Sequence, residues 1–245
     1  MASEIQTRRC PPLGATAWPP DDTEESILGT DLHQTTITNL RWGINEAARP
    51  RLPRGETIPW QASGQILFLG CAHPDGTDYR TYPDIFVYPR PIDQSRGSMA
   101  LVVDGAPVLI VEVLSESTYA ADLSMERGKV YSYASAGVRE YLALDPTGHF
   151  LPEGIRAWRL AGDAYRPWER SADGLWHSEQ IGVAIGLEGV LATVFARDGR
   201  RMLREGEVVA ELERRDAELE RRDAELHRAR VELEQLRRLL DERGI

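Results

Sequence analysis

Apolar and polar positions along the middle of the chain predict a mixed α/β domain. Short β-type runs are expected at 65–69, 84–88 and 107–114. The last run, PVLIVEVL, is almost continuously apolar, which is typical of a strand buried on both faces. A fourth run follows at 140–144, and alternating stretches at 155–161, 165–169 and 174–177 extend the expected sheet.

Two helices are expected beside these strands. The first covers about 26–48, with Asp31 as candidate N-cap and apolar residues such as Ile37, Leu40 and Ile44 on one broad face. The second covers 121–136, with Asp122 as candidate cap and Gly137 as its end. Strand, helix and strand in this order predict a βαβ-like crossover.

Residues 204–243 change to a charged helical pattern in which ERRDAEL occurs twice, at 213–219 and 220–226. A leucine stands at every seventh position from Leu212 to Leu240, which favours a left-handed coiled coil. Charged residues such as Arg215 and Asp216 interrupt the neighbouring stripe, and only Ala229 and Leu236 support it. Two interpretations stay open: a self-associating coiled coil, and a solvated helix held by i,i+4 ion pairs.

The chain therefore divides into three expected parts. Residues 1–23 contain four prolines and few apolar partners, and are expected to form a flexible N-terminal tail. Residues 24–203 form the folded domain, and residues 204–245 form the charged helical tail.

Composition narrows the class of protein. In 245 residues, 42% are apolar and 28% are charged, a soluble globular profile. No apolar run approaches the ~20 residues that span a bilayer, and the first residues do not resemble a secretory signal. Two cysteines are too few for a disulfide framework or a four-cysteine zinc site. We expect a cytoplasmic protein without membrane contact.

The formal net charge of −10 argues against a general nucleic-acid coat protein, since such binding depends on Lys and Arg. An enzyme that visits DNA through a divalent cation remains possible, because the metal supplies positive charge locally. Of the 29 basic residues, 28 are arginines, and the single lysine is Lys129. Two interpretations of this single lysine are open. Either its position requires a compact ammonium, or it is the one lysine that happens to remain.

The residues with the clearest chemistry lie between Pro83 and Asp145. Asp84 begins one expected strand, and Glu112 lies between Val111 and Val113 in the next. A buried carboxylate there needs a metal, a cation or good donors, and a purely structural arginine partner is the alternative. If the strands are neighbours, Asp84 and Glu112 present two hard oxygen ligands of the kind that Mg²⁺ prefers.

The following helix is expected to bring Lys129 to the same place. Asp122, Glu126, Lys129 and Tyr133 are spaced i, i+4, i+7 and i+11, which places them along one helix face. The ammonium of Lys129 would then orient the attacking water or stabilise charge in the transition state. The alternative is an exposed ladder of ion pairs among Asp122, Glu126 and Lys129.

The motifs PDIFVYP, PVLIVEVLSEST, D-x6-K-x3-Y and GVREYLALDP, in this order, resemble the Uma-type restriction endonucleases of the PD-(D/E)xK superfamily. The resemblance spans about 24–203 and includes LHQ at 32–34 and LATVFARDGRRML. It implies a restriction-endonuclease-like mixed sheet flanked by helices, and a divalent metal, Mg²⁺ or Mn²⁺, held by Asp84 and Glu112. At the position where the superfamily's motif has a lysine, this chain has Leu114. Lys129 on the following helix is the residue that matches the motif lysine.

The resemblance also implies a glutamate near the metal from the first helix. Glu24, Glu25 and Glu46 are all open for this role. His33 is a weaker candidate, because a lone histidine at the start of a helix is more often structural.

The leading functional hypothesis is a metal-dependent endonuclease that hydrolyses DNA phosphodiester bonds through Asp84, Glu112 and Lys129. The alternative is a catalytically inactive nuclease fold that binds a partner through its helical tail. A hydrolase of small phosphoesters is disfavoured, because there is no Walker-type loop and Ser115 and Ser117 lack the flanking glycines of a nucleophile elbow. Contact with DNA would be transient, and a homodimer through the core or the C-terminal helix is possible.

Overall fold

The computed structural model describes residues 31–49, 59–93 and 95–242. The expected tail at 1–23, Glu24, Glu25 and positions 26–30 of the first expected helix lie outside the described residues. The chain divides into two compact units, one ending at Met202 and one beginning at Leu203. The two units are described separately below.

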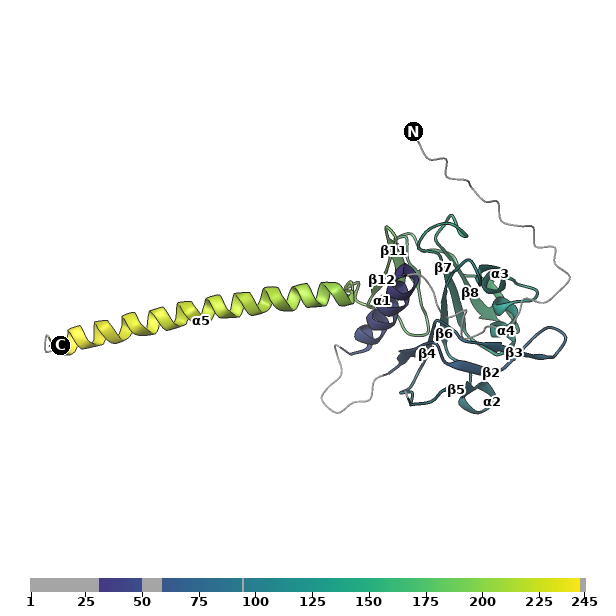
Figure 1. Cartoon of the computed structure of the whole chain (residues 1–245), viewed down its shortest axis with the longest axis horizontal. Helices are drawn as coiled ribbons and strands as arrows, with labels where there is room; N and C mark the ends of the chain where they lie inside the picture. Colours follow the sequence, from purple (N-terminus) through teal and green to yellow (C-terminus); the bar gives the residue numbers. More distant parts are fainter. Residues whose placement is uncertain (1–30, 50–58, 94, 243–245) are drawn as a thin grey trace, which may run out of the picture. The chain divides into compact units, whose positions relative to one another are not determined.

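A six-stranded mixed sheet forms the centre of the first unit, in the order β1-β4-β6-β7-β8-β9 (Figure 1). Its strands are β1 (Gln61–Ser63), β4 (Ile85–Tyr88), β6 (Leu109–Val113), β7 (Glu140–Leu144), β8 (Ile155–Ala161) and β9 (Ala164–Pro167). β6 and β7 are parallel, and the other neighbours in this sheet are antiparallel. The expected strand–crossover–strand unit is therefore confirmed.

Two small three-stranded sheets accompany the central sheet. One has the order β3-β2-β5, with β2 (Leu67–Ala72), β3 (Asp78–Thr81) and β5 (Ser98–Ala100), and the short helix α2 (Leu101–Asp104) follows β5. The other has the order β10-β11-β12, with β10 (Trp176–His177), β11 (Ala184–Glu188) and β12 (Leu191–Phe195). Strands β1, β3, β5, β11 and β12 and helix α2 were not expected from the sequence.

Side chains on the two faces of the central sheet belong to two separate hydrophobic clusters, because successive strand residues point in opposite directions. Along β6, Leu109, Val111 and Val113 pack in the cluster that includes helix α1 (Asp31–Ala48). Ile110 belongs to the opposite cluster. Glu112 points to that second face as well, so it is a charged side chain within an apolar layer.

The second face carries helices α3 (Tyr119–Leu123) and α4 (Lys129–Ser135), and here the expected single helix at 121–136 is wrong. The chain leaves the helical path at 124–128, where the Arg127 amide donates to Ser124 Oγ. A Cβ atom on Gly128 would lie 2.0 Å from the Ala121 carbonyl oxygen. This close backbone approach folds α4 back against α3, and Asp122 lies inside α3 instead of capping a longer helix.

The second unit is one helix, α5 (Glu205–Glu242), as the sequence predicts. Its leucines at 212, 219, 226 and 233 are each between 53% and 58% exposed. In the part of the chain that the structure describes, no helix is both long and apolar enough to cross a membrane.

Replacing Gly128 by alanine is expected to destabilise the first unit by at least ~2 kcal/mol, because the new methyl group overlaps the Ala121 carbonyl. The measurement is urea denaturation of the full chain. Gly97→Ala is the matched control, since the methyl group that it adds has no neighbouring atom within 4 Å. Equal midpoints for the two variants would contradict this account of the α3–α4 break.

Candidate active site

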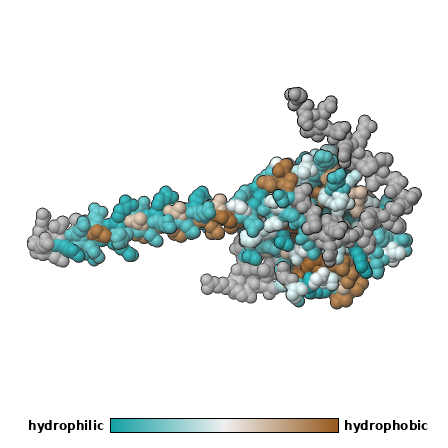
Figure 2. Space-filling view, viewed as in Figure 1, coloured by the Kyte–Doolittle hydropathy of each residue, from teal (hydrophilic) through white to brown (hydrophobic). Residues whose placement is uncertain are grey.

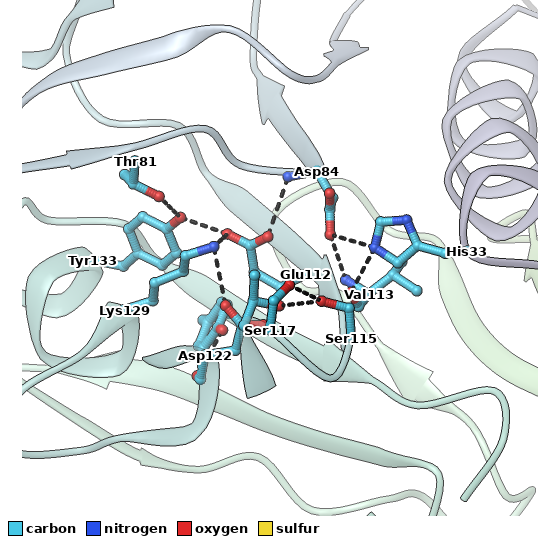
Figure 3. Close-up of polar contacts among 12 residues, drawn as sticks. His33, Thr81, Asp84, Glu112, Val113, Ser115, Ser117, Asp122, Lys129 and Tyr133 are labelled. Carbon is cyan, nitrogen blue, oxygen red and sulfur yellow. Dashed lines mark hydrogen bonds and ion pairs between the residues drawn. The ribbon is translucent and has the colours of Figure 1, made fainter. Parts of the chain in front are cut away.

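Asp84 and Glu112 face each other across two antiparallel strands. Ile85 pairs with Val111, so that Asp84, one residue before β4, lies opposite Glu112. The Asp84 amide donates to Glu112 Oε2 at 3.2 Å, and the Val113 amide donates to Asp84 Oδ2 at 2.8 Å. Each carboxylate is thereby held by the backbone of the other strand (Figure 3).

Glu112 is 1% exposed, and its second oxygen is bound by two side chains of α4. The Tyr133 hydroxyl donates to Glu112 Oε1 at 2.5 Å, and Lys129 Nζ lies 3.2 Å from the same oxygen. Thr81 Oγ1 on β3 lies 2.9 Å from the Tyr133 hydroxyl. Lys129 Nζ also lies 3.0 Å from Asp122 Oδ1. One ammonium therefore joins two buried carboxylates.

This cluster decides two alternatives that the sequence left open. Asp122 and Lys129 are 1% and 2% exposed, whereas Glu126 is exposed, so the solvated ion-pair ladder is wrong. The cation that lies 3.2 Å from Glu112 is Lys129, the only lysine of the chain, and not the arginine of the structural alternative. A compact ammonium fits between two carboxylates at this depth, where a planar guanidinium needs more room.

His33, the weaker candidate from the sequence, reaches the same site from α1. Its Nε2 donates to the Val113 carbonyl at 2.9 Å and lies 3.6 Å from Asp84 Oδ2. Burial lowers the pKa of His33, but the hydrogen bond and charge of Asp84, with the Val113 carbonyl, outweigh it and leave this pKa raised. The spacing of His33, Ile37 and Leu40 places all three on the buried helix face, and that pattern could have identified it.

Glu46, the one first-helix glutamate that the structure describes, does not join the site. It lies in the last turns of α1 and forms an ion pair with Arg49 at 3.1 Å. Thr81 had no signal in the sequence, because it comes from a strand whose pairing was not predicted.

Asp84 and Glu112 are the residues of this site that could hold a divalent cation. Asp84 Oδ1 makes no hydrogen bond or ion pair with a described residue, and the Asp84 side chain is 11% exposed against 2% for Glu112. Hard carboxylate oxygens suit Mg²⁺, which keeps several of its own water ligands. Among the described residues, no three His, Cys, Asp or Glu side chains are grouped to hold a metal, so waters would complete the coordination.

Neither the buried cysteine nor the serines after β6 provide a nucleophile. Burial raises the pKa of Cys71 to about 12, so its thiol stays protonated at neutral pH. Ser115 Oγ contacts Ser117 Oγ and Thr118 Oγ1, and the Ser115 carbonyl accepts from the Tyr119 amide. These residues form the turn that leads from β6 into α3.

The fold and the site define a nuclease-type α/β protein in which two strand carboxylates and a helix lysine meet. Residues 24–187 match the family model Uma2, which is described as "Putative restriction endonuclease". The chain belongs to this family and has its restriction-endonuclease-like fold. No curated protein matches the chain.

Replacing Tyr133 by phenylalanine is expected to cost about 1–3 kcal/mol of unfolding free energy, because Glu112 Oε1 loses a buried donor. Tyr131→Phe on the same helix is the control, since Tyr131 is only half-buried and should change stability little. Urea unfolding of both variants measures the difference. If Tyr133→Phe leaves the unfolding free energy unchanged, the Tyr133 hydroxyl does not stabilise the buried Glu112.

Proposed function

We propose that this protein is a Mg²⁺- or Mn²⁺-dependent endonuclease that hydrolyses DNA phosphodiester bonds. The observation that carries the proposal is the meeting of Asp84, Glu112 and Lys129 at the end of one antiparallel strand pair. Membership of a family described as restriction endonucleases supports the same reaction class. DNA is the proposed substrate, bound transiently.

Asp84 and Glu112 are the proposed metal ligands. Asp84 offers Oδ1, while Glu112 Oε1 is fixed by Tyr133 and Lys129. A bound divalent cation supplies an activated water and stabilises charge on the scissile phosphate. The backbone bonds between the two strands hold both carboxylates in place before any cation arrives.

Lys129 is the proposed cationic group of the reaction. Its ammonium lies 3.2 Å from a proposed metal ligand, so it is placed to orient the attacking water or to stabilise developing negative charge. Asp122, 3.0 Å away on the other side, holds this ammonium against the strand. The lysine thus reaches the site from α4, although the motif position on β6 is Leu114.

The purified chain is expected to nick supercoiled DNA with Mg²⁺ or Mn²⁺. Asp84→Asn, Glu112→Gln and Lys129→Met should each lower the rate by roughly a hundredfold or more, because each removes transition-state stabilisation. Glu126→Gln, an exposed residue before α4, is the matched control and should keep full activity. Circular dichroism verifies that each variant is folded.

Calorimetric titration separates the roles of the three residues. Mn²⁺ affinity should fall in Asp84→Asn and Glu112→Gln but persist in Lys129→Met, since the lysine is not a proposed ligand. Cleavage that survives both Asp84→Asn and Lys129→Met would contradict the proposed mechanism.

A second candidate function is a catalytically inactive nuclease fold that binds a partner through its helical tail. The observation that favours it is the full engagement of Glu112 by protein donors, with Lys129 supplying the positive charge beside it. A folded wild-type chain that neither binds Mn²⁺ nor cleaves DNA would support this alternative.

A further inference from the structure

The charged helix α5 carries a pattern of side chains that the catalytic proposal does not use. Four leucines, at 212, 219, 226 and 233, recur every seven residues and are each more than half exposed. Figure 2 shows isolated hydrophobic positions along this otherwise hydrophilic helix. A seven-residue leucine period is the pattern of a helix that pairs with another helix.

The charges beside these leucines change sign along the helix. Four residues after successive leucines stand Asp216, Asp223, Arg230 and Arg237. With the leucines at heptad position a, these four residues occupy position e, at the edge of the helix interface. One half of this edge is acidic and the other half is basic.

The acidic half has no basic partner within its own helix. Asp216 and Asp223 have no arginine or lysine three or four positions away, where a helical ion pair requires one. By contrast, Arg215 donates to Glu211 and Arg222 donates to Glu218, each four residues earlier. The two aspartates are therefore the charges for which a partner from another chain is most useful.

We infer that α5 pairs with α5 of a second copy of this chain as an antiparallel coiled coil. In an antiparallel pair the e edges face each other, whereas in a parallel pair each e edge faces the g edge. Antiparallel pairing brings Asp216 against Arg237 of the second copy and Asp223 against Arg230 of the second copy. Symmetry repeats both attractive contacts.

The same register also produces apolar contacts at its centre. Leu226 lies opposite Ala229 of the second copy, and Leu233 lies opposite the aliphatic stem of Arg222 of the second copy. The guanidinium of Arg222 is already turned aside to Glu218 at 2.7 Å. A shift by one heptad in one direction would place Asp223 against Asp223 of the second copy. A shift in the other direction would place Arg230 against Arg230 of the second copy, so the charges select one register.

A parallel pair is disfavoured by the same residues. Its g edge consists of glutamates, including Glu218 and Glu225, each directly before a leucine. Repulsive contacts such as Glu218 against Asp223 of the second copy would cancel attractive contacts such as Glu225 against Arg230 of the second copy. Arg215 and Arg222 would each also face their own counterparts across the interface. The antiparallel pair keeps one unfavourable contact type, Glu225 against Glu232 of the second copy. Arg228 lies three residues after Glu225 and four residues before Glu232 on the same helix, so a positive charge stands close to both glutamates.

Charge reversal in the full chain tests the inference by sedimentation equilibrium over a concentration series. Asp223→Arg and Arg230→Asp should each weaken the dimer about tenfold, because two attractive pairs become two repulsive pairs. An equimolar mixture of the two variants should restore association, since every e contact is then complementary. The double variant with both changes in one chain should dimerise like the wild type.

Each other outcome overturns the antiparallel pair. A parallel coiled coil would be strengthened by Asp223→Arg, and mixing the two variants would not favour their heterodimer. Dimerisation through the first unit would be insensitive to both changes, and a wild-type chain that stays monomeric would have no pair at all. Arg238→Asp, on the outer face five residues after Leu233, is the matched control and should dimerise normally.

Discussion

The ion pair between Lys129 and Glu112, buried near the end of β6, is the interaction on which the architecture of the site depends. A buried carboxylate is costly unless it is paired and hydrogen-bonded. Here the cost is offset by an ammonium, a tyrosine hydroxyl and a backbone amide, contributed by α4 and by the residue before β4. Removing one partner leaves a buried charge, so the cluster holds together as a unit.

The path of the chain follows from this requirement. α4 must begin where Lys129 can reach β6, and the close approach at Gly128 lets α3 and α4 fold against each other so that Asp122 and Lys129 meet. The parallel pairing of β6 with β7 places the α3–α4 crossover over the same face of the sheet. From the other face, α1 brings His33 to the Val113 carbonyl. Both layers therefore converge on the end of one strand.

Much of the fold and of the site could be predicted from local sequence patterns. The apolar runs around Asp84 and Glu112 locate two strands. The spacing of Lys129 and Tyr133 correctly places both on one face of α4, but the same pattern wrongly adds Glu126, which is exposed. The break before Lys129 could not be predicted, because it depends on a backbone contact with Ala121 that exists only in the folded chain. Thr81 was missed for a similar reason, since long-range pairing with β2 places it there. The position of His33 is indicated by the buried face of α1, which it shares with Ile37 and Leu40, and not by any motif around it.

The burial of Lys129 has a practical consequence for chemistry on the intact protein. Apart from an amino terminus, this side chain is the only primary amine in the sequence, and it is 2% exposed. An acylating reagent can modify it only when α4 separates from β6, so the rate of its modification reports how often that separation occurs. The chain thus contains a natural chemical reporter for the opening of its own candidate site.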